Sequence, residues 1–234
     1  MVPRYRAVRT GGCLHAHAET RADGSVVLRS TEALGDFPAR LTDRLAHWAR
    51  EAPERTFVAR RGPDGAWIRI TYAQMFERVQ RVGQALAMRG LSPERPIAIL
   101  SDNDLEHLTL ALAAMWVGVP YAPISPAYST VSQDYGKLRQ ILATLTPGLV
   151  FASDGAAYGR AIQACIPKDT ALVLARGEVP GRAHQRFDDL LATAPGPEVA
   201  AAHAAVGPDT IAKFLFTSGS TKQPKGVINT HRML

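Results

Sequence analysis

Short apolar runs alternate with helix-like amphipathic segments through most of the chain after residue 70, and this alternation restricts the possible fold more than any other feature. The apolar runs have the length of buried strands. The segments between them repeat apolar residues at the three- and four-residue spacing of one helix face. Such an alternation builds a mostly parallel sheet covered by helices on both faces. The sequence therefore predicts an α/β fold with a doubly wound, mostly parallel sheet.

Capping and turn residues mark the ends of the predicted elements. Thr71 and Gln74 have the spacing of a capping box, and Gly90 ends the helix that they begin. We predict that the next helix begins at Asn103 and ends at Gly118. Further predicted helices follow Pro38 and cover residues 132–145, 155–164 and 188–191, and the predicted strands cover residues 57–59, 67–70, 96–100, 119–124, 149–151, 171–174 and 211–216.

The two ends of the chain and one internal stretch lack this regular pattern. Residues 1–35 predict an irregular N-terminal arm with at most a short strand at Ser25–Leu28, and residues 36–234 form the predicted domain. Residues 192–208 are rich in Ala, Pro and Gly and predict a surface crossing. After the strand at 211–216, we expect the sheet to end on an unpaired strand near residues 226–230.

Composition narrows the class of protein without identifying it. A chain of 234 residues with 46% hydrophobic and 21% charged residues is an ordinary globular chain. Its net charge of +6 suits an anionic ligand, but the arginines are scattered and no nucleic-acid motif is present, so we expect no nucleic-acid partner. No apolar run has transmembrane length. Two cysteines without metal spacing, Cys13 and Cys165, favour a cytoplasmic location and indicate no metal site.

The segment FLFTSGSTKQPKGV, residues 214–227, carries the strongest indication of function. An apolar run stops at five small residues, four of them hydroxylated, and two lysines follow. Small residues let backbone N–H groups surround a polyphosphate, and Lys225 can offset its charge. The predicted phosphate-binding residues are Thr217, Ser218, Gly219, Ser220, Thr221 and Lys225. The alternative is a Ser/Thr-rich turn between strands. The GxxxxGK[ST] pattern is absent, which disfavours a phosphoryl-transferring NTPase.

The same segment closely resembles the phosphate-binding motif of the adenylate-forming superfamily, [YF]TSG[ST]TGxPKGV. Lys222 stands where that family usually has Gly, and every other position matches. Ile70–Tyr72 and Trp116–Ile124 resemble two further, mainly structural, elements of the family. The resemblance implies that the fold is the N-terminal part of the large domain of an adenylate-forming enzyme.

Further segments resemble the feruloyl-CoA synthase subgroup, and together the matches span nearly all of residues 25–234. These segments are Phe37–Thr42, Leu45–Ala49, Ser125–Ser129, Ser132–Asp134 and Asn229–Leu234. The resemblance implies an AMP-forming acid–CoA ligase that uses ATP, Mg²⁺ and CoA, and the carboxylic acid that it leads us to expect is an aromatic one such as ferulate. It assigns no catalytic residue within this chain.

The resemblance also implies that the chain is a fragment, truncated just after the phosphate loop. The glutamate that holds Mg²⁺, the ribose-binding aspartate and the catalytic lysine of the superfamily all lie downstream of that loop. The chain alone is therefore expected to lack ligase activity. The alternatives are a non-catalytic truncated module and a fatty-acid CoA ligase. Among the histidines, His15 and His17 favour a surface location, whereas His231 follows the loop and could contact substrate or nucleotide.

Overall fold

The computed structural model describes residues 15–33, 35–217 and 223–234, and divides the chain into two units, Met1–Phe37 and Pro38–Leu234. In the first unit, β1 (Ala16–Thr20) pairs in antiparallel fashion with β2 (Val26–Ser30). Gly24 has a φ of +81°, and the Asp23 carboxylate accepts a hydrogen bond from the Ser25 backbone N–H at 2.9 Å. The sequence predicts only a short strand here, because β1 is exposed throughout and has no apolar face of its own.

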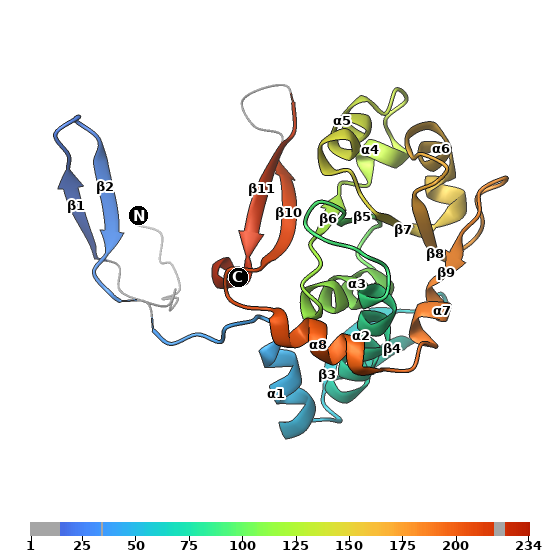
Figure 1. The fold of residues 1–234 in the computed structure, drawn as a ribbon, viewed down its shortest axis with the longest axis horizontal. Helices are drawn as coiled ribbons and strands as arrows, with labels where there is room; N and C mark the ends of the chain where they lie inside the picture. The colour runs from blue at the N-terminus through green and yellow to red at the C-terminus, as the bar shows by residue number, and fades with distance from the viewer. Residues whose placement is uncertain (1–14, 34, 218–222) are drawn as a thin grey trace, which may run out of the picture. The chain divides into compact units, whose positions relative to one another are not determined.

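The second unit contains a seven-stranded sheet in the order β11-β10-β6-β5-β7-β8-β9 (Figure 1). All neighbouring strands are parallel except β11, which runs antiparallel to β10. The strands are β5 (Ile97–Leu100), β6 (Tyr121–Ile124), β7 (Leu149–Asp154), β8 (Ala171–Arg176), β9 (Gln185–Arg186), β10 (Ile211–Thr217) and β11 (Lys225–Thr230). This topology confirms the predicted α/β fold with a mostly parallel sheet. In the described part of the chain, β11 forms one edge of the sheet, as expected.

Helices cover both faces of this sheet, and the residues of each central strand alternate between the two faces. Ile97 and Ile99 of β5 pack into the core below α2 and α3, whereas Ala98 and Leu100 pack into the core below α5 and α6. The first face carries α1 (Asp43–Glu51), α2 (Tyr72–Ala87), α3 (Leu105–Trp116), α7 (Phe187–Leu191) and α8 (Pro197–Ala205), and the second carries α4 (Ala127–Thr130), α5 (Gly136–Leu145) and α6 (Gly155–Cys165) (Figure 1). Burial on both faces explains why the strands are apolar without alternation in the sequence.

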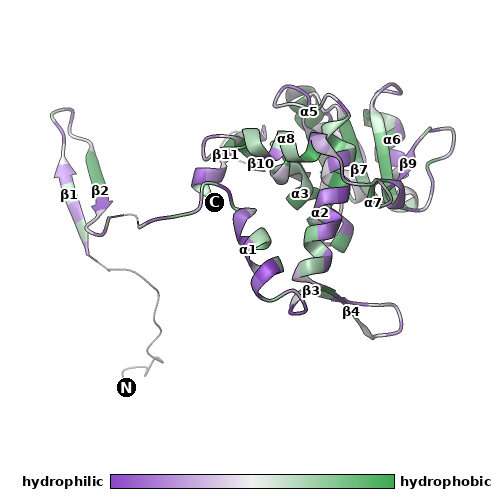
Figure 2. Cartoon of the chain, turned by 60° about the horizontal axis from the view of Figure 1, so that its bottom comes forward, coloured by the Kyte–Doolittle hydropathy of each residue, from purple (hydrophilic) through white to green (hydrophobic). Residues whose placement is uncertain are grey.

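A separate two-stranded hairpin, β3 (Thr56–Arg61) and β4 (Trp67–Thr71), leads into α2. Thr71 caps that helix as predicted, because its side chain accepts a hydrogen bond from the Gln74 backbone while the Gln74 side chain accepts one from the Thr71 N–H. Hydrophilic and hydrophobic residues alternate along α2 (Figure 2). Its apolar side, which includes Met75, Val79 and Leu86, is fully buried. Local sequence and burial therefore specify the same helix.

Three predicted boundaries are wrong. Helix α3 begins at Leu105 rather than Asn103, because the Asp104 carboxylate caps it by accepting from the Leu105 N–H at 2.8 Å. The predicted helix over 132–145 begins only at Gly136, and the short helix α4 precedes it. The predicted surface crossing at 192–208 contains α8, whose first residue is Pro197. Proline suits the first turn of a helix, where its missing N–H costs nothing.

Candidate functional site

The predicted phosphate-binding segment includes the ends of the paired strands β10 and β11 and the residues between them. Thr217 and Lys225 are the last paired residues before that turn, and both are exposed. Ser218, Gly219, Ser220 and Thr221 lie outside the described residues, as does Lys222. Of the six predicted phosphate-binding residues, the structure thus describes two and places them opposite each other.

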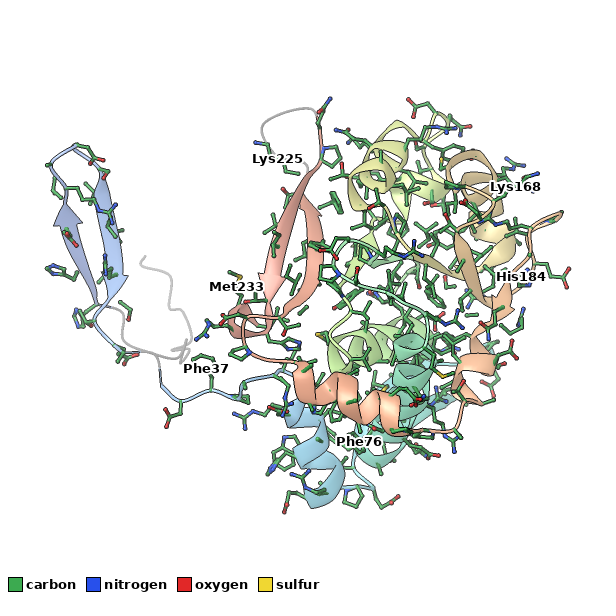
Figure 3. The ribbon with its side chains drawn as sticks, viewed as in Figure 1. Phe37, Phe76, Lys168, His184, Lys225 and Met233 are labelled. Atoms are coloured by element: carbon green, nitrogen blue, oxygen red, sulfur yellow. The ribbon has the colours of Figure 1, made fainter. Side chains whose placement is uncertain are left out.

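The direction of the strands places this turn at the ligand-binding edge of the sheet. β10 runs parallel to β6, with Lys213 opposite Tyr121, so Thr217 lies at the carboxyl end of β10. In open parallel sheets, ligands bind beyond the carboxyl ends of the strands. Lys225 lies near the turn and Met233 lies at the opposite end of the hairpin (Figure 3). An extended anion bound beyond the sheet edge would therefore meet Lys225.

Charged side chains from four elements meet at the carboxyl ends of β5, β7 and β8. The Arg176 guanidinium lies 3.1 Å from one Asp104 oxygen and 3.0 Å from an Asp154 oxygen, and Arg60 lies 3.6 Å from the other Asp104 oxygen. The Asp104 side chain is only 8% exposed. Asp154 also caps α6, since it accepts hydrogen bonds from the backbone N–H groups of Ala156 and Ala157. This network links residues at the carboxyl ends of these neighbouring strands to each other.

The pKa values of Asp104 and of the neighbouring Glu106 are shifted in opposite directions. Burial opposes ionisation of Asp104, but hydrogen bonds with Glu106 and Arg176 hold the pKa of Asp104 below its usual value. Burial raises the pKa of Glu106, and the neighbouring Asp104 raises it further. Of the two, Asp104 therefore loses its proton more readily, which is consistent with its two arginine partners.

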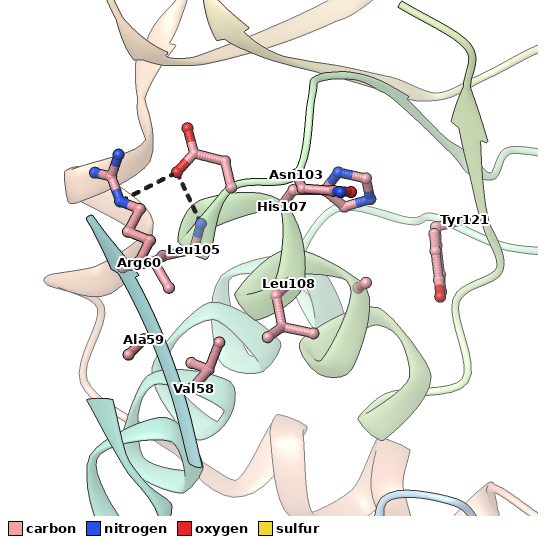
Figure 4. A pocket seen from close by; sticks show the side chains of 10 residues that line it. Val58, Ala59, Arg60, Asn103, Leu105, His107, Leu108 and Tyr121 are labelled. Atoms are coloured by element: carbon pink, nitrogen blue, oxygen red, sulfur yellow. Dashed lines mark hydrogen bonds and ion pairs between the residues drawn. The ribbon is translucent and has the colours of Figure 1, made fainter. Parts of the chain in front are cut away.

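A cavity of about 390 Å³ lies beside this network, between β3 and α3 (Figure 4). Apolar side chains form most of its wall, and Asp104 and Arg60 lie at one side of it. The lining residues are Val58, Ala59, Arg60, Asn103, Asp104, Leu105, His107, Leu108, Ala111 and Tyr121. Burial lowers the pKa of the half-buried His107 ring. The neutral ring and the apolar wall suit a largely uncharged group rather than a polyphosphate.

His231 does not lie beside the phosphate-binding turn. It follows β11 directly and is 3% exposed, whereas Lys225 begins the same strand. Six residues of extended strand span about 20 Å. His231 and Lys225 therefore lie at opposite ends of β11, and a contact of His231 with substrate or nucleotide stays a prediction.

Sequence reasoning missed the Asp104–Arg176–Asp154 network and the cavity. Asp104 and Asp154 each stand directly before a helix, which is the position of an N-cap, and this signal was available in the sequence. No signal in the sequence indicated their shared partner Arg176. It lies on strand β8 and is separated from Asp104 by 72 positions of sequence.

The described residues form an α/β fold with a mostly parallel sheet, and the Ser/Thr/Gly-rich segment follows the carboxyl end of β10 in the sequence. The AMP-binding enzyme family matches residues 45–234, and the chain belongs to this family. The chain is 30% identical over 203 residues to "3-[(3aS,4S,7aS)-7a-methyl-1,5-dioxo-octahydro-1H-inden-4-yl]propanoyl:CoA ligase" of Rhodococcus jostii. This match covers 83% of this chain and 38% of that protein. It is also 30% identical to the phosphinothricin tripeptide synthetase PhsB of Streptomyces viridochromogenes, over 80% of this chain and 14% of that protein.

Solved structures show the same fold. A red-emitting luciferase from Phrixothrix hirtus matches with a TM-score of 0.63 and 20% identity, over 84% of this chain and 37% of that one. A fatty acyl-adenylate ligase from L. pneumophila, solved with acyl adenylate and pyrophosphate, matches with a TM-score of 0.58 and 20% identity, over 82% of this chain and 30% of that one. The chain thus spans well under half the length of these relatives and structures.

The described residues lack two features. None of their helices combines the length and the apolar character that crossing a membrane requires. Within the same residues, no three His, Cys, Asp or Glu side chains are grouped so that they could hold a metal ion.

Proposed function

We propose that the chain forms the phosphate-binding part of an ATP-dependent acid–CoA ligase. The observation that carries this proposal is the turn between β10 and β11, with Thr217 opposite Lys225 at the carboxyl edge of the sheet. Membership of the AMP-binding family and the identity to a CoA ligase support it.

In the proposed reaction, a carboxylate oxygen of the acid attacks the α-phosphorus of ATP, and the bond to pyrophosphate breaks. The CoA thiolate then attacks the acyl carbon, and AMP leaves. The chain would contribute by holding the β- and γ-phosphates, through the backbone and hydroxyls of residues 217–221 and the charge of Lys225. Positioning and charge neutralisation account for most of the catalysis in reactions of this type.

Mg²⁺ would accompany ATP in this reaction. Magnesium bound with nucleotides is commonly held by substrate phosphates and one or two carboxylates rather than by a cage of protein ligands.

We further propose that the acid is aromatic, on the basis of the segments that resemble feruloyl-CoA synthase. A ligase that contains residues 1–234 should release pyrophosphate and AMP when given ferulate, ATP and CoA, as measured by coupled pyrophosphate release and nucleotide chromatography. Activity confined to medium- or long-chain fatty acids would refute the aromatic substrate and leave adenylate formation intact.

A second candidate is an adenylation unit that delivers its acyl group to a carrier protein instead of CoA. The identity to a tripeptide synthetase favours this candidate. The two candidates differ in their second step, so the acceptor separates them. Exchange of pyrophosphate into ATP without any thioester formed on CoA would favour the carrier protein, whereas formation of an aryl-CoA favours the ligase.

A further inference from the structure

The base of the β10–β11 hairpin is held by contacts that are independent of its turn. The His231 backbone N–H donates to the Thr210 carbonyl at 3.1 Å, and the Arg232 N–H donates to the Pro208 carbonyl at 2.8 Å. Both acceptors lie just before β10, so the two ends of the hairpin are joined at this point. Pairing of β10 with β6 holds the hairpin in the sheet, and the contacts of its base with the helices add a second attachment.

The His231 side chain makes the connection to α1. Its Nδ1 accepts a hydrogen bond from the Leu41 backbone N–H at 3.3 Å, two residues before α1 begins. An imidazole nitrogen that accepts carries no proton, so the neutral ring has its proton on Nε2. Nε2 is buried without a well-formed hydrogen bond, although the Met115 carbonyl of α3 lies close enough to act on the ring. Protonation of Nδ1 would convert this acceptor into a donor facing another donor.

The groups around the ring do not offset an added positive charge. Asp43 favours a protonated ring, but Arg40 and His203 oppose it. The Asp43 carboxylate already pairs with Arg40 at 2.9 Å. Arg40 also donates to the His203 carbonyl at 3.2 Å, which keeps its guanidinium in this cluster.

His203 itself is committed to other contacts. Its ring stacks on Trp116 with centroids 3.5 Å apart, and its Nδ1 lies 3.0 Å from the Trp116 carbonyl oxygen. Burial lowers the pKa of His203 and of His231 alike. A neutral pair of rings is therefore the form that this packing accommodates.

We infer that His231 is a positioning residue for the β10–β11 hairpin: its neutral ring fixes the base of this hairpin to the segment before α1, and protonation releases that contact. The phosphate role of the turn rests on the proposed function, whereas the anchoring of the hairpin does not. His231 acts through β11 and not through contact with the nucleotide, because Lys225 lies at the other end of that strand.

The sign of the pH dependence follows from the direction of the shift. The folded-state pKa of His231 lies below its usual value because the ring is buried. The contribution of His231 is therefore fully present above about pH 6.5, the ordinary histidine pKa, and decreases as the pH falls below it. We expect the hairpin to loosen on mild acidification while the rest of the sheet stays folded.

Hydrogen exchange of the 234-residue chain at about pH 7.5 and about pH 5.8 tests this inference, with rates corrected for intrinsic exchange and referenced to α2. In the wild type, exchange in residues 225–234 should rise about fivefold on acidification, the factor for one lost hydrogen bond of ordinary strength. His231→Asn keeps an acceptor at the Nδ1 position that does not titrate, so its exchange should change less than about twofold. His17→Asn, on exposed β1, serves as the matched control and should behave as wild type.

The same pH response in His231→Asn as in the wild type would overturn the inference. A second measurement needs no variant: as the pH falls, the rise in hairpin exchange must begin near the ordinary histidine pKa and level off near the His231 midpoint followed by NMR of its imidazole, and a rise outside that range would also overturn the inference. MgATP binding measured on the same samples separates this inference from the proposed function. Absence of ATP binding at either pH would count against the phosphate role, while the exchange data alone decide the anchoring by His231.

Discussion

Lys225→Ala should lower ATP–pyrophosphate exchange by about tenfold to a hundredfold in a ligase that contains this chain, because a charge-assisted hydrogen bond is worth about 1.5–3 kcal/mol. Lys225 is exposed, lies opposite Thr217, and forms no ion pair with the described residues, so its charge is available to a ligand. Removing it should leave folding unaffected. Exchange of radiolabelled pyrophosphate into ATP, measured with saturating acid, gives the effect directly.

Lys168→Ala is the matched control for this experiment. Lys168 is equally exposed, but it lies between α6 and β8, at the amino end of its strand and thus at the opposite edge of the sheet. The control removes the same charge from the protein without altering the hairpin. If Lys225→Ala loses no more activity than Lys168→Ala, then Lys225 does not bind phosphate and its position on β11 is only structural.

The second large effect concerns stability. Gly155 begins α6 directly after β7, and a Cβ added to it would lie 2.6 Å from the Glu178 carbonyl oxygen and 2.7 Å from the Glu178 backbone carbon and nitrogen. These atoms belong to the main chain and cannot rotate away. Overpacking typically costs about 1–3 kcal/mol and sometimes more, so Gly155→Ala should destabilise by about 3 kcal/mol. For a chain of this size that corresponds to a fall in Tm of about 6–12 °C.

Gly207→Ala provides the comparison. A Cβ at Gly207 meets no atom within 4 Å, and its backbone is not in the left-handed region. Thermal unfolding followed by circular dichroism should therefore place Gly207→Ala within about 2 °C of the wild type. Equal melting temperatures for the two variants would show that the backbone around Glu178 yields easily, contrary to the packing described.

Local and alternating patterns explain why most of the second unit could be predicted from the sequence. The strand Ile97–Leu100 is a continuous apolar run because both of its faces are buried, and the capping box of Thr71 and Gln74 involves only adjacent turns of chain. Helix α8 was missed because its capping is not local. The Gln84 side chain of α2 accepts hydrogen bonds from the N–H groups of Gly196 and Val199, and Gly196 lies 112 positions away in the sequence.

The candidate site likewise has one part that the sequence predicts and another part that depends on contacts between distant residues. The small residues and Lys225 are contiguous in sequence, and their composition alone indicates a phosphate-binding turn. The carboxylate network and the docking of His231 depend on residues that the fold brings together. Leu41 is separated from His231 by 190 positions, so no local pattern relates the two. Sequence reasoning therefore singled out the segment that we propose binds phosphate and missed the contacts made by the base of its hairpin.

Hydrogen exchange in the presence of nucleotide tests most directly whether the β10–β11 hairpin holds the triphosphate of ATP. With MgATP, we expect slower exchange in peptides that cover residues 211–217 and 223–228, and no such change with AMP, which lacks the β- and γ-phosphates. Peptides from the β3–β4 hairpin should be unaffected by either nucleotide. Unchanged exchange at the β10–β11 hairpin, or slowing confined to residues 58–60 and 103–108 around the cavity beside α3, would contradict the proposal that this turn binds phosphate.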